Sequence, residues 1–168
     1  MAHVMAKDYD TAIRLLEAGP EPTFESFQSE MDTDDAIDFL HGLAFAYQET
    51  GAGEKAAAIL EDVRSNLAGE NAEGKNFPPI VVRTAQNAAL RGEVREAIDT
   101  LQSAIELGFN DYYWIATDIW WGETAMQPEF HALLDAMKLR VDQQRSRFES
   151  MHDEQAFRAE IRALLQLP

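Results

Sequence analysis

Two segments of the chain repeat the same pattern of small residues at a constant separation. In each, an alanine is followed by a glycine and then by a second alanine, at Ala44, Gly51 and Ala56 and again at Ala85, Gly92 and Ala97. The second set lies 41 residues after the first. Small side chains let two helices approach closely, and glycine permits a tight turn between them. The repeat therefore predicts two successive helix hairpins that are built in the same way.

The spacing of apolar residues predicts an all-α fold. Apolar residues recur with the helical period in almost every segment, and no stretch alternates cleanly between apolar and polar residues. We expect one domain over residues 1–168, with a polar loop over 68–77 and a short helix within 20–35. The remaining helices are expected over about 8–18, 35–49, 54–67, 79–91, 93–107, 111–121, 128–151 and 154–167.

Several helix ends carry recognisable signals. Gly19 and Pro20 should stop the first helix, and the acidic run from Asp32 to Asp35 supplies oxygen acceptors to the free amides of the next one. Pro78 and Pro79 suit a first helical turn, where a missing amide hydrogen costs nothing. These signals agree with the boundaries that the apolar spacing predicts.

With this spacing the chain resembles the tetratricopeptide repeat (TPR) family, whose units of two helices are about 34 residues long. The resemblance implies one unit over 37–68, another over 78–109, and a partial unit over 8–18 in which Ala12 and Leu16 match Ala56 and Leu60. The 68–77 loop accounts for the longer period. The implied fold is an α-solenoid of antiparallel helix pairs, with capping helices over 111–167.

The resemblance also implies a context and a role. The first helix of the partial unit would lie upstream of Met1, so we expect this chain to be the C-terminal piece of a longer protein. The tail after Gly108 is similar to the end of TPR regions in bacterial winged-helix transcriptional regulators and class III adenylate cyclases. Such a region implies a protein-interaction or sensor module for signalling or transcription regulation, without enzymatic activity.

In TPR units the first helix of each pair lines the concave face. Carried over to this chain, that rule gives a partner-binding set formed by Asp38, His41, Phe45, Gln48, Glu49, Val82, Gln86 and Ala89. Phe45 beside His41 suits an anchored peptide. Phe45 could equally pack against the 20–35 segment.

The densest aromatic cluster is formed by Tyr112, Tyr113, Trp114, Trp120 and Trp121. It suits a lid that seals the end of the helical stack. It also suits an exposed patch for a partner or for a second copy of the chain. A different class of function, a structural homo-oligomerisation domain, would use this cluster or the helix over 129–151.

The charge of −16 is unevenly distributed, because residues 15–54 hold ten acidic residues and no Lys or Arg. Such a field repels nucleic acid and anionic lipid, so both are excluded as partners. No apolar run approaches the roughly 20 residues that cross a bilayer. One interpretation of the acidity is that it keeps the protein soluble. The other is that it attracts a basic protein or peptide partner.

Residues with catalytic or metal-binding spacing are not found. Cysteine is absent, and His3, His41, His131 and His152 have no spacing that places two on one helix face. The acids of 32–38 lack the central glycine and the final glutamate of a calcium loop, and the glycines of 51–55 lack the spacing of a phosphate loop. We therefore predict no enzyme activity, no metal and no cofactor.

Overall fold

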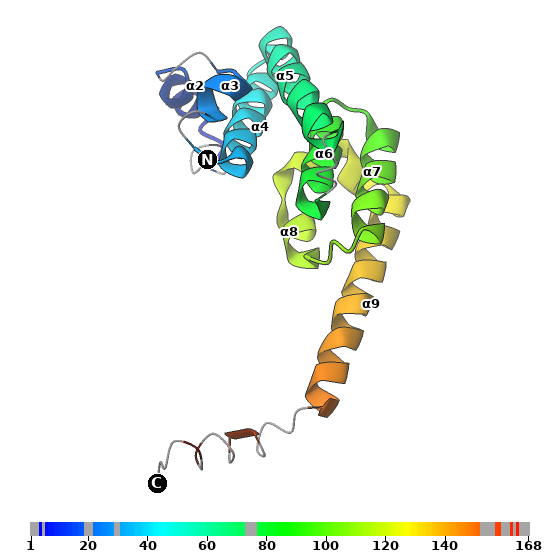
Figure 1. Cartoon of the computed structure of the whole chain (residues 1–168). Helices are drawn as coiled ribbons and strands as arrows, with labels where there is room; N and C mark the ends of the chain where they lie inside the picture. Colours follow the sequence, from blue (N-terminus) through cyan, green and yellow to red (C-terminus); the bar gives the residue numbers. More distant parts are fainter. Residues whose placement is uncertain are drawn as a thin grey trace.

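The computed structural model describes residues 4, 6–18, 22–28, 31–72, 77–151, 157–158, 162 and 164. Within these residues all regular structure is helical, which confirms the all-α fold class (Figure 1). In chain order, the helices are α2 (Tyr9–Leu16), α3 (Phe24–Gln28), α4 (Thr33–Glu49), α5 (Gly53–Ala72), α6 (Pro78–Leu90), α7 (Val94–Glu106), α8 (Tyr112–Thr117), the 3-10 helix η1 (Ile119–Met126) and α9 (Pro128–Met151).

The repeated alanines lie where neighbouring helices meet. Helix α4 packs against α5, α6 packs against α7, and α5 joins the two pairs by packing against α6. Ala44, Ala56, Ala85 and Ala97 are each at most 1% exposed. Their methyl groups are therefore enclosed within the helix pairs, as the repeated pattern predicted.

The repeated glycines end their helices in the same way. Gly51 has a φ of 81° and Gly92 a φ of 76°, both in the left-handed region. In each turn the amide after the glycine donates to the carbonyl five residues earlier, at 2.8 Å in the first turn and 2.9 Å in the second. Gly108, with a φ of 106°, ends α7 with a matching bond of 3.0 Å. These three ends share the Schellman pattern of hydrogen bonds.

The apolar interior is divided into two clusters. The first is built mainly by α2 to α5, and the second mainly by α6 to α9 together with Phe109, which lies between α7 and α8. Two consecutive residues of η1 belong to different clusters, because Trp120 packs in the first and Trp121 in the second. Helix η1 therefore connects the two halves of the interior.

Two predicted boundaries are wrong. The loop expected over 68–77 begins later, because α5 continues to Ala72. The residues after the buried Leu67 include good helix formers, and one glycine does not end a helix. The single helix expected over 111–121 is broken at Asp118, whose backbone is extended (φ −77°, ψ 137°) and whose carboxylate caps η1. Gly122 kinks η1 further, with a φ of 45° and a ψ of −124°.

Two expectations fall largely outside the described residues. These are the stop at Gly19 and Pro20, and most of the closing helix over 154–167. Within that closing segment, the described Phe157 and Leu164 are 55% and 72% exposed.

We predict that Gly92→Ala lowers the free energy of unfolding by about 1 to 2 kcal/mol, because a Cβ is disfavoured in the left-handed region. No atom lies within 4 Å of the Cβ that alanine would add, so the cost is conformational. Gly69→Ala, within α5 and also in open space, is the matched control and should stabilise by about 0.5 to 1 kcal/mol. Urea unfolding of both variants checks the difference, and equal effects would contradict the assignment.

We also predict that Ala97→Leu lowers the free energy of unfolding by about 1 to 3 kcal/mol, because the enlarged side chain separates α6 from α7. Ala57→Leu, on the exposed side of α5, adds the same atoms without entering the interior and should change stability by less than about 0.5 kcal/mol. Thermal and urea unfolding of the two variants provide the measurement. A tolerated leucine at 97 would show that close helix approach is not required there.

Candidate partner-binding site

The residues predicted to line a concave face are distributed between the interior and the surface. His41, Val82, Gln86 and Ala89 are buried. Asp38 and Phe45 are partly buried, and Gln48 and Glu49 are exposed. The structure thus brings this set together on one side of α4 and α6, but only part of it contacts solvent. Its partner-binding role stays a prediction.

The chain's own segment 118–121 lies on this side of α4 and α6. The side-chain amide of Gln86 donates to the Asp118 carboxylate. The Trp120 ring lies edge-on to His41 and to Phe45, with centroid distances of 6.4 Å and 5.7 Å. The α4–α6 face, defined by Asp38, His41, Phe45 and Gln86, therefore already holds an acidic and aromatic segment.

The Phe45 ring contacts aromatic rings of two other elements, η1 and α2. Besides Trp120, it meets Tyr9 of α2 edge-on, with the ring centroids 6.0 Å apart. Neither of these contacts involves the 20–35 segment, against which Phe45 was expected to pack as one alternative. Within the described residues, Phe45 joins the first helix to the C-terminal half of the domain.

Arg83 is the central cation of the α4–α6 face, and the sequence-based prediction missed it. Its side chain is 6% exposed, is ion-paired with Asp38, and lies 3.6 Å from the carboxylate of Asp34. Its guanidinium stacks over the Trp114 ring at 4.7 Å. An arginine between the buried Val82 and Ala85 was the available signal, because a cation on a buried helix face needs a partner.

His41 is a buried and neutral member of the same face. Burial lowers the pKa of His41 to about 3, and the nearby charge of Arg83 acts in the same direction. Its Nε2 lies 3.4 Å from the side-chain nitrogen of Asn87, which can only donate. The ring proton is therefore assigned to Nδ1, which has no hydrogen-bond partner among the described atoms.

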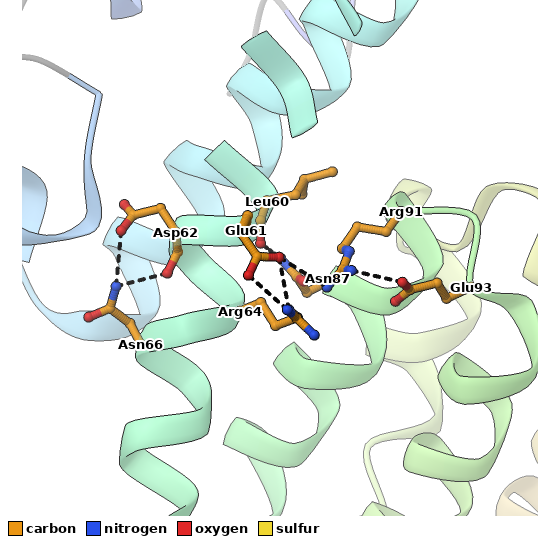
Figure 2. A network of polar contacts seen from close by, with 8 residues as sticks. All are labelled: Leu60, Glu61, Asp62, Arg64, Asn66, Asn87, Arg91 and Glu93. Atoms are coloured by element: carbon orange, nitrogen blue, oxygen red, sulfur yellow. Dashed lines mark hydrogen bonds and ion pairs between the residues drawn. The ribbon is translucent and has the colours of Figure 1, made fainter. Parts of the chain in front are cut away.

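Asn87 connects this face to a polar network between α5 and α6 (Figure 2). Its side chain donates to the Leu60 carbonyl at 3.1 Å. Nearby, Arg91 lies 3.7 Å from Glu61 and 2.8 Å from Glu93. The contacts of Asn87 and Arg91 with Leu60 and Glu61 join α5 of the first helix pair to α6 of the second.

Asp118 is the ionisable group that the 118–121 segment contributes. Burial raises the pKa of Asp118 to about 6, while the Trp120 amide and the Arg83 charge oppose that shift. A neutral carboxyl can still accept from Gln86 and from the amide of Trp120 at 3.2 Å. The face therefore combines a cation, an amide donor and a neutral imidazole, which suits recognition of carboxyl and aromatic groups.

The aromatic cluster is divided between two environments. Trp120 and Trp121 are 3% and 1% exposed, and Trp121 packs on Phe130 with ring centroids 5.1 Å apart. Tyr113 is 74% exposed, while Tyr112 and Trp114 are partly buried. The tryptophans of η1 thus cover the interior, whereas Tyr113 presents its ring to solvent.

Two features are absent from the described part of the chain. There, no three His, Asp or Glu side chains converge in a way that could hold a metal ion. Among the helices of the same residues, none combines the length and apolarity that a membrane span requires.

We predict that the stability advantage of the native chain over Asp118→Asn falls as pH rises from 4 to 7. The folded state, in which the pKa of Asp118 is about 6, holds its proton up to that pH, whereas the unfolded state releases it near the ordinary pKa of 3.8. Stability from protonated Asp118 is thus present at low pH and lost through this window, by an amount on the order of 2 kcal/mol. The titration of His41 affects the stability of both proteins equally, so it does not contribute to the difference between them. Urea unfolding across this range tests the trend, and a constant difference would contradict it.

The chain matches no family model, no curated protein and no solved structure. Its function is therefore inferred from the contacts and charges of its own residues.

Proposed function

We propose that this chain is a non-enzymatic protein-interaction module of TPR-like, solenoidal form, within a larger bacterial signalling or transcription-regulating protein. Its helix pairs repeat with a constant period and carry the same glycine-ended turns. Repeated helix pairs of this kind present extended surfaces to protein partners. The proposal places the function on a surface rather than in a catalytic centre.

The observation that carries the proposal is the binding of segment 118–121 on the α4–α6 face. Trp120 anchors between His41 and Phe45, and Asp118 accepts from Gln86. Aromatic anchors in buried pockets with flanking polar contacts are typical of peptide recognition. The face is thus built to hold a short segment, which here belongs to the same chain.

The exposed continuation of this face is acidic. Glu49 and Gln48 extend it at the C-terminal end of α4, and Asp34 and Asp35 lie at the N-terminal end. Residues 15–54 contain no Lys or Arg, and the cation beside Asp34 and Asp38 is Arg83 of α6, whose side chain is 6% exposed. Complementary potential would accelerate and orient the approach of a basic peptide or protein. We therefore propose a basic partner that docks along α4.

A peptide selection tests this function. Peptides selected from a random displayed library on the full chain should be basic, and Glu49→Lys should weaken their binding by about tenfold through loss of charge complementarity. Fluorescence anisotropy with a selected peptide measures the dissociation constant. Binding should also weaken as salt is raised, since the charges concerned are exposed.

The matched control is Glu106→Lys, which reverses an exposed acid at the end of α7 and changes the net charge equally. It should leave binding within about twofold if recognition is local. An equal loss of peptide affinity in both variants would show that net charge alone causes the effect. A selection that yields no binding peptide would contradict the proposed function.

The alternative function is a structural homo-oligomerisation domain that uses the aromatic cluster or the 129–151 helix. It is favoured by the exposure of Tyr113 and Met126, at 74% and 76%, close to the buried tryptophans in sequence. Light scattering after size-exclusion chromatography separates the two functions. A strict monomer at high concentration removes the alternative, and a dimer disrupted by Tyr113→Ala supports it.

A further inference from the structure

Helix α9 carries an apolar seam with a seven-residue period. Positions 134, 141 and 148 hold Leu134, Val141 and Phe148, and positions 137 and 144 hold Met137 and Gln144. Alternating steps of three and four residues place these side chains on one face of a helix, as at the a and d positions of a coiled coil. The seam runs for two heptads through the described helix.

The domain itself uses only the first part of this seam. Phe130 and Met137 are 2% and 1% exposed and belong to the second apolar cluster. Val141 is half-buried, and Phe148 is 59% exposed. Figure 1 shows why, because the C-terminal half of α9 extends beyond the other helices. The same face that is core near Phe130 becomes surface near Phe148.

The positions that flank the seam are all basic. In the heptad frame, the e positions hold Lys138 and Arg145, and the g positions hold Arg140 and Arg147. All four side chains are exposed. The acidic residues of this stretch take the neighbouring b positions, at Asp135, Asp142 and Glu149, and the Asp142 carboxylate lies 3.9 Å from the Arg145 guanidinium. Four of the 14 basic residues of a chain with a charge of −16 thus border one apolar strip.

This arrangement determines which helices can pair with α9. The e and g residues of a coiled coil contact those of the partner helix and select it by charge. A second copy of α9, in either orientation, would place basic e and g positions against basic ones, and like charges in that position are repulsive. A helix with acidic flanks would form complementary pairs with the same residues.

We propose that the C-terminal half of α9, residues 138–149, is a docking surface for an acidic amphipathic helix of another protein. The partner would carry apolar residues at its a and d positions and Glu or Asp at e and g. The aliphatic stems of Arg145 and Lys138 would cover the edges of the apolar contact while their charges meet the acidic flanks.

This surface is distinct from the α4–α6 face and attracts the opposite charge. A failure here leaves binding of basic peptides to α4 unaffected, and a failure there leaves α9 unaffected. The two proposals are therefore tested separately on the same protein.

Two synthetic helical peptides serve as probes for this surface. Both are three heptads long with Leu at a and d, and they carry Glu or Lys at every e and g position. The full chain should bind the Glu peptide at least about tenfold more tightly than the Lys peptide, with affinity that falls as salt is raised. The double variant Arg145→Glu/Arg147→Glu should reverse the preference, because the flanks then repel the acidic peptide.

Two further variants locate the contact. Val141→Asp should abolish binding of the Glu peptide, since it places a charge in the seam. Arg95→Glu, at an exposed arginine of α7 outside the seam, should leave binding unchanged. Circular dichroism of each variant confirms that the helices remain.

Three outcomes would overturn the proposal. One is equal binding of both peptides. Another is a native chain that dimerises through α9, shown by a dimer that Val141→Asp dissociates in light scattering. The third is binding that appears only when residues 152–168 are removed, because the seam would then be covered by the chain's own C-terminal segment.

Discussion

The packing of Trp120 and Trp121 into two separate apolar clusters is the interaction on which the rest of the structure depends. One ring lies among the helices of the N-terminal half and the next among those of the C-terminal half. Burying two indole side chains removes several hundred square ångströms of apolar surface from water. The free energy gained is large compared with the total stability of a small domain. The extended Asp118 and the kink at Gly122 allow consecutive side chains to point into different clusters.

The packing of Trp120 determines how much of the α4–α6 face is exposed to solvent. In a stack of helix pairs the inner helices would otherwise expose His41, Phe45 and Gln86. Here the 118–121 segment covers them, and the Gln86 side-chain amide donates to the Asp118 carboxylate. Burial then follows for Arg83 and His41, and the low pKa of His41 is a consequence of that burial. The face therefore holds a segment of its own chain.

Charge separates the molecule into regions with opposite preferences. Residues 15–54 hold ten acidic residues and no Lys or Arg, whereas α9 carries basic residues along an apolar strip. At physiological salt, exposed charges act over about 8 Å, so each region presents its own field to a nearby partner. The net charge of −16 alone concealed the basic strip of α9. The two proposed docking surfaces would take partners of opposite charge.

The sequence by itself determined the local structure, because helix ends, glycine turns and close alanine contacts depend on residues near one another along the chain. The period of Ala44, Gly51 and Ala56 predicted the burial and the turns correctly, and the apolar spacing predicted an all-helical chain. Only the tertiary structure decided that Arg83 pairs with Asp38, that Trp120 covers His41, and that Phe148 lies at the surface. The two contacts join residues 45 and 79 positions apart, and the exposure of Phe148 depends on where the rest of the domain ends. No local pattern encodes either.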